Sequence, residues 1–212
     1  MTGLRTALMR GLLRPGDPVV EDDWADRLDV SRTPIRAAIS VLATEGLLVK
    51  RGRQVYVFRP SLDDLIEVYE IRRALEGLAA SLAADAIDQD GLVYLEKQLS
   101  EMNHTHGTAE WFTAHERFHM GIFEGSGRKR LVDMIEVLRR QSEPYVRYAV
   151  HADRKFQANA MKDHRQMLAT MKRRDGAMMS TLVERHLNAT VNLLMGLLAI
   201  SPNGEISPLL PL

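Results

Sequence analysis

The chain has 212 residues, of which 45% are hydrophobic, and its 28 Lys and Arg balance 28 Asp and Glu. This composition supports a packed core and excludes a disordered chain, while no apolar run reaches the length that crosses a membrane. Because cysteine is absent, disulfides and thiolate sites are excluded, and a cytoplasmic protein is expected.

Although the net charge is zero, positive charge gathers near the N-terminus. Residues 29–60 contain six Lys and Arg against two Asp and Glu, whereas residues 61–212 contain 18 against 21. A local basic excess is typical of a module that binds nucleic acid. Because the excess is modest, we expect two copies of the module to bind together.

Two short helices are predicted before residue 30. The first spans residues 2–13, and its apolar face consists of Leu4, Leu8 and Leu12. A turn at residues 14–17 ends it. The second spans Glu21–Leu28, and its residues expected to face inward are Trp24, Ala25 and Leu28.

A third helix follows a tight connection at Asp29 and Val30. Thr33 is expected to cap this helix, with Pro34 at the first helical position, where the missing N–H would be unpaired anyway. The apolar residues recur at i, i+3, i+4 and i+7, and they are Ile35, Ala38, Ile39 and Leu42. The pattern therefore predicts a helix with one buried face.

Arg32 and Arg36 lie at the start of this helix, away from its apolar face. Cations there oppose the helix dipole, so they suit a helix start that meets a phosphate or a guanine edge. The alternative is an exposed arginine pair on an ordinary surface helix. Two short helices joined by a tight turn favour the first interpretation, because the second helix of a helix-turn-helix enters the major groove.

A basic hairpin is predicted after the third helix. The segment VKRGRQVYVF, residues 49–58, has two β-rich ends around a tip of Arg51, Gly52 and Arg53. Such a hairpin is the wing of a winged helix-turn-helix.

Three motifs now make the first quarter of the chain similar to the DNA reader of the GntR family of bacterial transcription regulators. They are RPGD at residues 14–17, VSRTPIR at 30–36 and EGL at 45–47. The resemblance implies that the third helix and the wing meet DNA, through Ser31, Arg32, Thr33, Arg36, Arg51, Gly52 and Arg53.

From Ser61 to about Ile200 the sequence predicts only helices. Ser61 and Asp64 form a capping box, and the helices are expected at 62–86, 90–103, 108–124, 128–150, 154–173 and 176–199. The proline-rich tail at 201–212 is expected to be disordered. The fold class is therefore mainly α, with a winged helix-turn-helix at residues 1–60 and an all-α bundle at 61–200.

Four histidines fall on the apolar faces of three predicted helices. His115 and His119 are four residues apart, so both rings leave the same face of one helix, as two imidazoles that share a metal ion must. His164 and His186 lie on the apolar faces of two later helices. A single such histidine is usually a core residue with a hydrogen bond. Burying four without partners is unfavourable, and a shared metal ion would use their ring nitrogens.

Residues 62–200 resemble the FCD effector domain of the FadR-type branch of the family. The motifs are YEIR at 69–72, LE at 75–76, FH at 118–119, EGSG at 124–127 and DH at 163–164. The resemblance implies a divalent metal held by an aspartate and three histidines. His119, His164 and His186 match the three histidines, but His115 stands where the aspartate would be. An all-imidazole site favours zinc or nickel over manganese and magnesium; the alternative is an empty, degraded site.

The same resemblance implies that Arg72 lines the effector cavity and pairs with a carboxylate of the effector. The alternative is a surface salt bridge between Arg72 and Glu76. The salt bridge would join two side chains four residues apart on one helix face.

The leading interpretation is a homodimeric repressor that reads a double-stranded DNA operator and responds to a small carboxylate effector bound near the metal. No membrane association or enzymatic activity is expected. One alternative is a regulator for which the metal itself is the signal. Another is a metal-dependent hydrolase, which lacks a well-placed general base because Glu116 points about 100° away from His115 around the helix.

Overall fold

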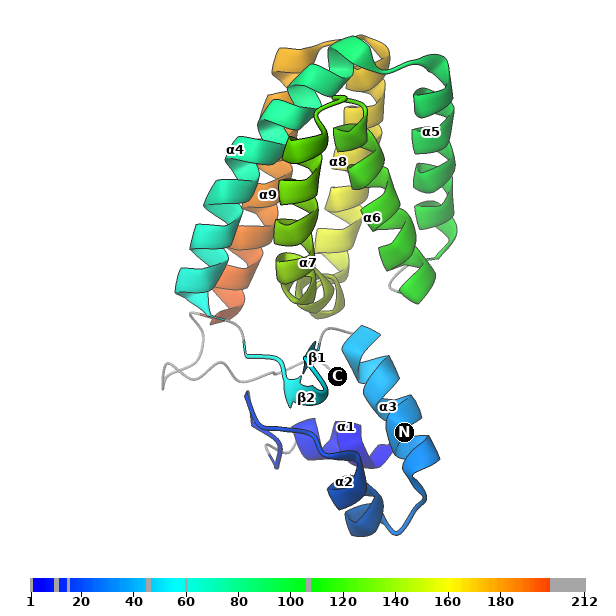
Figure 1. Cartoon of the computed structure of the whole chain (residues 1–212), viewed down its shortest axis with the longest axis vertical. Helices are drawn as coiled ribbons and strands as arrows, with labels where there is room; N and C mark the ends of the chain where they lie inside the picture. Colours follow the sequence, from blue (N-terminus) through cyan, green and yellow to red (C-terminus); the bar gives the residue numbers. More distant parts are fainter. Residues whose placement is uncertain are drawn as a thin grey trace.

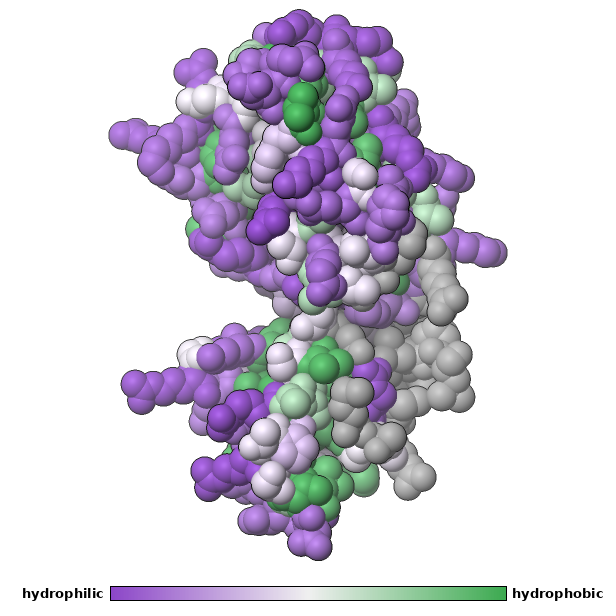
Figure 2. Space-filling view, turned by 90° about the vertical axis from the view of Figure 1, so that its right-hand side faces the viewer, coloured by the Kyte–Doolittle hydropathy of each residue, from purple (hydrophilic) through white to green (hydrophobic). Residues whose placement is uncertain are grey.

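The computed structural model describes residues 2–9, 12–14, 16–44, 47–59, 61–105 and 108–198. Its N-terminal part, called the head here, contains the helices α1–α3 and a two-stranded sheet. Its C-terminal part, the bundle, contains the helices α4–α9, which lie above the head in Figure 1. Figure 2 shows an indentation between the two parts on one side of the molecule. The mainly α fold class with a small wing is therefore confirmed.

The head is built on three short helices, α1 (Thr2–Met9), α2 (Glu21–Leu28) and α3 (Arg32–Thr44). Asp29 ends α2 in the left-handed conformation with a φ of 50°, which turns the chain sharply into α3. The inward faces of α2 and α3 bury the residues that the sequence predicted for them, apart from Leu28: Trp24, Ala25, Ile35, Ala38, Ile39 and Leu42.

Three details of the head differ from the predictions. Within the described residues α1 ends at Met9, and the amides of Leu12 and Leu13 both bond to the carbonyl of Ala7. The helical period is lost there, so Leu12 is 68% exposed and Leu13 is buried in its place. Leu28, expected to face inward, is 36% exposed; it lies in the last turn of α2, and its side chain packs beside Gly3 of α1.

The start of α3 also differs from the prediction. The helix begins at Arg32, so Thr33 lies within its first turn and Ser31 precedes it. Pro34 becomes the third helical residue instead of the first. Proline is tolerated at the third position as well as at the first, because none of the first four amides of a helix has an intrahelical partner.

The wing is an antiparallel pair of strands, β1 (Leu48–Arg51) and β2 (Gln54–Val57). Arg51 pairs with Gln54, and the tip between them contains Gly52, whose φ of 61° suits glycine. Backbone hydrogen bonds from Val19 to Val55 and from Val57 to Asp17 fasten the segment before α2 to the outer edge of β2. The predicted hairpin is therefore present and is anchored to the head.

The bundle helices agree with the predicted spans to within two residues. They are α4 (Leu62–Ala86), α5 (Gln89–His104), α6 (Ala109–Glu124), α7 (Lys129–Ala152), α8 (Arg154–Lys172) and α9 (Gly176–Leu198). Side-chain oxygens cap four of them by accepting a backbone N–H in the first turn, namely Ser61, Asp88, Thr108 and Asp153. The expected domain limit near residue 60 and the expected disordered tail, 201–212, lie outside the described residues.

Helices distant in the sequence pack together in the bundle. The first and last, α4 and α9, run side by side, and α5 covers α6 (Figure 1). Gly77 permits the close approach of α4 to α9, since a Cβ there would lie 2.9 Å from Ser180 Oγ. Among the described residues, none of the helices is both long and apolar enough to span a bilayer.

Candidate metal centre and nucleic-acid interface

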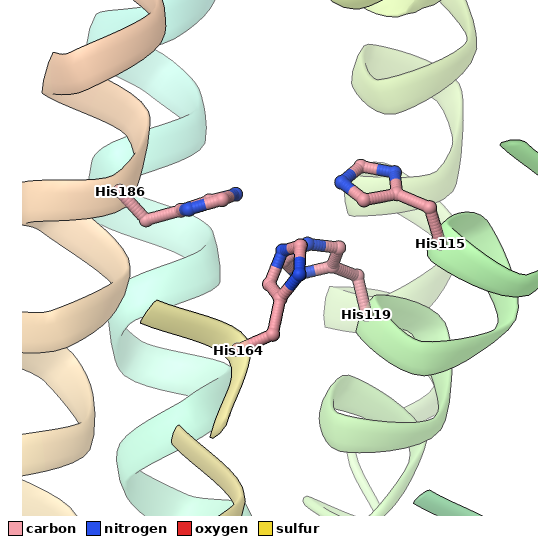
Figure 3. A group of neighbouring side chains, drawn as sticks. All are labelled: His115, His119, His164 and His186. Atoms are coloured by element: carbon pink, nitrogen blue, oxygen red, sulfur yellow. The ribbon is translucent and has the colours of Figure 1, made fainter. Parts of the chain in front are cut away.

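The four histidines singled out in the sequence come together inside the bundle. His115 and His119 extend from α6, His164 from α8 and His186 from α9, and their rings converge on one point (Figure 3). One nitrogen of each ring lies within 4.8 Å of the corresponding nitrogen of every other ring, and His119 Nε2 lies 3.1 Å from His164 Nε2. All four side chains are buried.

Three rings of the cluster are kept neutral by their surroundings. Burial, followed by the positive charges of neighbouring rings and arginines, holds the pKa of His115, His119 and His164 well below the usual value of 6.5. A neutral imidazole offers one lone pair to an ion. The Nδ1 atoms of His164 and His186 are buried and have no hydrogen-bond partner among the described residues. Ring nitrogens that converge within 4.8 Å of one another, as one from each of these four rings does, are what a transition metal ion requires.

Two neighbours hold the cluster in place. The Trp111 ring stacks on His115 at 4.8 Å between centroids with 18° between the planes. Asp163 Oδ2 lies 3.6 Å from His186 Nδ1, on the side of α8 that faces α9. Asp163 also accepts a hydrogen bond from Arg185 at 2.5 Å. A carboxylate near the outer nitrogen of a histidine is common in metal sites, because it orients the ring.

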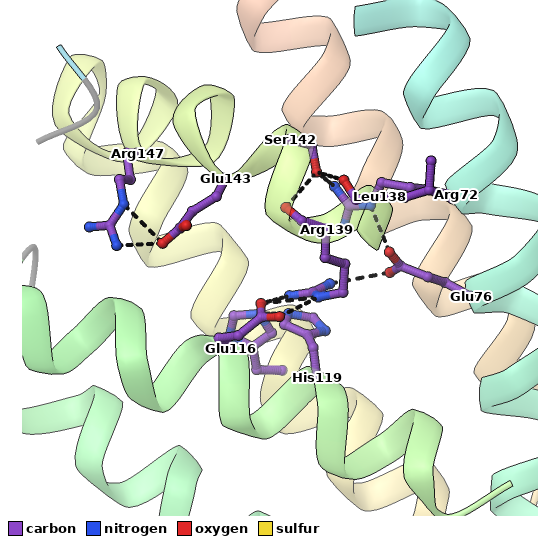
Figure 4. Close-up of polar contacts among 10 residues, drawn as sticks. Arg72, Glu76, Glu116, His119, Leu138, Arg139, Ser142, Glu143 and Arg147 are labelled. Atoms are coloured by element: carbon purple, nitrogen blue, oxygen red, sulfur yellow. Dashed lines mark hydrogen bonds and ion pairs between the residues drawn. The ribbon is translucent and has the colours of Figure 1, made fainter. Parts of the chain in front are cut away.

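An ion network borders the cluster, buried except at Glu116, whose side chain is 44% exposed (Figure 4). Arg72 contacts Glu76 at 2.6 Å and donates to Ser142 Oγ at 2.9 Å. Arg139, from α7, contacts Glu76 at 3.3 Å and Glu116 at 2.8 Å. Two cations therefore face two anions, and the network is neutral as a whole. Burial alone would lower the pKa of Arg72, but the adjacent Glu76 carboxylate outweighs it and keeps the arginine charged.

This geometry corrects one alternative from the sequence. The pair of Arg72 and Glu76 exists, but it is not a surface salt bridge, because the two side chains are only 3% and 1% exposed. The spacing of four residues predicts the pair correctly. It does not predict that the pair is buried. The burial depends on Arg139 and Ser142, which lie on a helix some seventy residues later in the chain.

A cavity lies between the histidines and the network. The space within it that a water-sized sphere can enter is only about 20 Å³, and its polar walls include Arg72, Arg139, His115, His119 and His186. Apolar side chains also line it, among them Val146, Val150, Phe156, Ala160 and Leu187. Only a small part of this space is wide enough for a water molecule, so a larger ligand would require these side chains to move.

Glu116, the residue considered as a general base, is held by Arg139 through two hydrogen bonds to its Oε2, at 2.8 and 3.1 Å. Although partial burial raises the pKa of the Glu116 carboxyl, the Arg139 guanidinium outweighs this effect and lowers the pKa overall. The carboxylate is therefore committed to an ion pair, and a hydrolytic role for it is disfavoured.

The sequence did not single out Arg139, although the residue borders both the histidines and the cavity. A signal for it was present. Ile135, Arg139 and Ser142 recur at i, i+4 and i+7 on α7, and all three are buried. A charged residue within a buried stripe is rare unless it is paired, so this pattern points to a buried partner.

The residues expected to meet DNA form a solvent-exposed surface on the head. On α3 and just before it, Ser31, Arg32, Thr33 and Arg36 are exposed, and at the tip of the wing so are Arg51, Gly52 and Arg53. The two α3 arginines are not free. Arg32 Nε lies 2.6 Å from Asp22, and Arg36 Nη2 lies 2.9 Å from Glu21. Both carboxylates belong to the acidic first turn of α2.

Comparison with known proteins decides the family. Residues 2–57 match the model of the bacterial regulatory proteins of the gntR family, and residues 67–189 match the FCD domain. The chain belongs to the GntR family of transcription regulators and carries an FCD domain. The expected resemblance is thereby confirmed, and the chain groups with DNA-binding regulators, not with enzymes.

Individual relatives agree with this assignment. The uncharacterized HTH-type transcriptional regulator YdhC of Bacillus subtilis is 33% identical over 139 residues, and the match spans 63% of this chain and 62% of that relative. The HTH-type transcriptional repressor RspR of Escherichia coli is 26% identical over 87% of this chain and 82% of its own. The solved structure of E. coli McbR/YncC, at 24% identity, superposes with a TM-score of 0.63 over 91% of this chain and 93% of its own, which shows a shared fold.

Proposed function

We propose that this regulator is a homodimeric repressor whose bundle binds a divalent metal through His115, His119, His164 and His186, and whose operator binding responds to a small carboxylate beside that metal. The observation that carries the proposal is the convergence of four buried imidazoles, three of which have a depressed pKa. Neutral rings that face one point have lone pairs to offer and no charge to repel a cation.

The ligand set favours zinc or nickel. Tetrahedral coordination with bonds of about 2.0–2.1 Å places ligand nitrogens roughly 3.3 Å apart. The separation of 3.1 Å between His119 and His164 is close to that value, and the widest separation in the cluster, 4.8 Å, requires the rings to close inward. Four nitrogen ligands without a carboxylate suit zinc and nickel better than manganese or magnesium.

An anionic effector follows from the charge balance. The arginine network is neutral because Glu76 and Glu116 compensate Arg72 and Arg139. Imidazoles that coordinate an ion add no charge, so a bound divalent ion would be the uncompensated charge beside the cavity. A small carboxylate would be attracted by that ion first, with Arg72 as a secondary partner that must loosen its contact with Glu76.

The DNA reader is proposed to act in pairs. One module, residues 1–60, carries a modest positive charge, and a dimer held by the helical module, residues 61–200, would present two copies of α3 to a pseudo-palindromic operator. Arg32 and Arg36 would leave Asp22 and Glu21 for the duplex, with Ser31 and Thr33 beside them. Arg51, Gly52 and Arg53 would follow the neighbouring groove.

Metal analysis tests the central part of the proposal. Zinc and nickel are titrated into chelator-treated protein by calorimetry, and the bound metal is counted by elemental analysis. We expect one ion per chain in the wild type and a large loss of affinity in His164→Ala. His104→Ala is the matched control, because His104 is exposed at the end of α5 and bonds only to the carbonyl of Ser100 among the described contacts. Wild-type protein that binds neither metal would refute the site.

A second function is favoured by the narrowness of the cavity, which leaves little room for an organic molecule. This second function is metal sensing, in which the metal itself is the signal. Operator affinity measured with and without zinc, in the absence of any organic ligand, separates the two functions. A zinc-dependent change of tenfold or more would favour the metal sensor.

A further inference from the structure

One arginine of the bundle reaches into the head and contacts the end of the recognition helix. Arg147 lies on α7, three residues after Pro144, and Figure 4 shows it on the same turns as Glu143. Its Nη1 donates to the carbonyl oxygen of Thr44 at 2.5 Å. Thr44 is the last residue of α3, and the Arg147 side chain is only 17% exposed.

This contact supplies what α3 lacks. The last carbonyl groups of a helix have no intrahelical partner and carry the negative end of the helix dipole, so a cation there is stabilising. The last turn of α3 contains no basic residue of its own. Arg147 therefore caps the recognition helix from the other part of the molecule, and its guanidinium is held in place by Glu143, which accepts from its Nε at 3.0 Å.

Three contacts in series lead from the same guanidinium to the histidine cluster. Arg147 Cζ lies 4.3 Å from the centre of the Phe112 ring. Phe112 meets Trp111 edge to face at 5.0 Å, and Trp111 stacks on His115 at 4.8 Å. A rotation of His115 toward a bound ion would therefore displace rings that are packed against Arg147.

The neighbours of Arg147 on α7 contact both the cavity and the head. Val146, the residue before Arg147, lines the cavity, and so does Val150, three residues after Arg147. Tyr145 fastens the start of α4, since its hydroxyl group donates to Asp64 at 2.8 Å, and its ring meets Phe58 at 5.0 Å. The last turns of α7 thus contact the cavity, the connection between the two parts and the recognition helix.

We propose that Arg147 is the positioning residue that couples the histidine cluster to the recognition helix. The coupling rests on the proposed function, whereas the capping of α3 does not. When the cluster changes its occupancy, the ring contacts of Arg147 change, and with them the anchoring of the end of α3. The orientation of Arg32 and Arg36, at the other end of the same rigid helix, then changes relative to the bundle.

The experiment compares Arg147→Met with Arg140→Met. Arg140 is a matched control, because it also lies on α7, pairs with a glutamate four residues earlier and lines the same groove between α7, α3 and β1, but has 61% exposure. The probe is a duplex that the wild type selects from a random-sequence library, and its Kd is measured with zinc and with chelator. Zinc affinity and thermal unfolding are measured in parallel.

We expect Arg147→Met to weaken duplex binding about threefold to tenfold, the range of a lost helix-end cation. The ratio of the Kd values with and without zinc should move toward one, while zinc affinity stays within twofold of the wild type. Arg140→Met should change neither quantity. Wild-type Kd values in both conditions for Arg147→Met would overturn the proposal.

A measurement without DNA keeps the two proposals separable. Amide hydrogen exchange of the peptide that covers the end of α3 should be faster in Arg147→Met, slightly faster in Arg147→Lys and unchanged in Arg140→Met. Unchanged exchange in Arg147→Met would remove the capping role even if the wild type selects no duplex. If the wild type binds no zinc, the metal site fails, and the exchange and chelator data still decide whether Arg147 positions α3.

Discussion

The head and the bundle each contain an arginine–glutamate pair, and the two pairs differ in their exposure to solvent. In the head, Arg36 bonds to Glu21 with side chains that are 70% and 32% exposed. In the bundle, Arg72 bonds to Glu76 with side chains that are 3% and 1% exposed. The geometry is similar, since both are close contacts to a single carboxylate, at 2.9 and 2.6 Å.

Exposure changes what each pair can do. Water and salt compete with the exposed pair, so it contributes little to stability and can be exchanged for a phosphate or a base. The buried pair has lost its hydration, so removing one partner leaves the other as an uncompensated charge. The head therefore has replaceable counter-ions at its proposed reading surface, whereas the bundle has a fixed network that shapes the wall of its cavity.

The largest expected effect comes from breaking the buried pair. Glu76→Gln should lower the free energy of unfolding by about 3–5 kcal/mol, because Arg72 and Arg139 would share one carboxylate fewer in a desolvated site. Denaturant unfolding measures the change. The control is Glu136→Gln, which breaks the exposed pair with Arg140 and should cost at most about 0.5 kcal/mol. Similar costs for the two variants would show that the buried pair is hydrated in solution.

Acid should destabilise the metal-free bundle. The folded pKa values of His115, His119 and His164 are depressed below about 6.5, the unfolded value, so above that pH both states are deprotonated and stability is unaffected. As the pH falls below 6.5, the histidines bind protons in the unfolded state but stay deprotonated in the folded state. Stability should then fall by about 1.4 kcal/mol per pH unit for each such proton.

Unfolding of chelator-treated protein at pH 7.5, 6.5 and 5.5 measures this slope. His115→Phe keeps a ring against Trp111 and removes one titrating group, so its slope between pH 6.5 and 5.5 should be shallower. His104→Ala, which changes an exposed ring, should keep the wild-type slope. A wild-type stability that is flat over this range would mean that the cluster is protonated or hydrated when folded.

Local signals explain how much of this fold was predictable. Helix ends in the bundle follow short-range chemistry, such as the Asp88 side chain that accepts from the amide of Gly91, so their positions could be read from the sequence. The histidines could be assigned to inward faces by their spacing, and those faces do meet. The periodicity failed near helix ends: Leu12 lies beyond Met9, the last described residue of α1, and Leu28 lies in the last turn of α2.

Partners that come from distant helices could not be predicted. The environment of Arg72 is decided by Arg139 and Ser142 on α7, and the end of α3 is capped by Arg147. None of these contacts has a fixed spacing in the sequence. Amphipathic periodicity tells which face of a helix is buried, but it does not tell which side chains from other helices cover that face.

On the head, Arg36→Ala tests whether the exposed arginine reads a base. If the arginine makes a bidentate contact with guanine, affinity for the selected duplex should fall by about fivefold to 150-fold, and the preference at one base pair should relax. A uniform loss across all duplexes would instead identify a phosphate contact. Lys129→Ala, which changes an exposed side chain paired with Asp133 in the bundle, should leave binding unchanged.

The smallest expected effect comes from the exposed counter-ion itself. Glu21→Gln removes the carboxylate that Arg36 must leave before it contacts DNA, and the hydrogen bond with Arg36 is also what lowers the pKa of Glu21. Thermal stability should hardly change, because the pair is exchanged with water. Affinity for random duplex should rise a few fold, and its logarithm should fall more steeply with the logarithm of salt concentration, since one more cation is available to phosphates. Weaker binding to random duplex in Glu21→Gln would show instead that the carboxylate orients Arg36, and the exposed pair would then resemble the buried one in being a fixed part of its site.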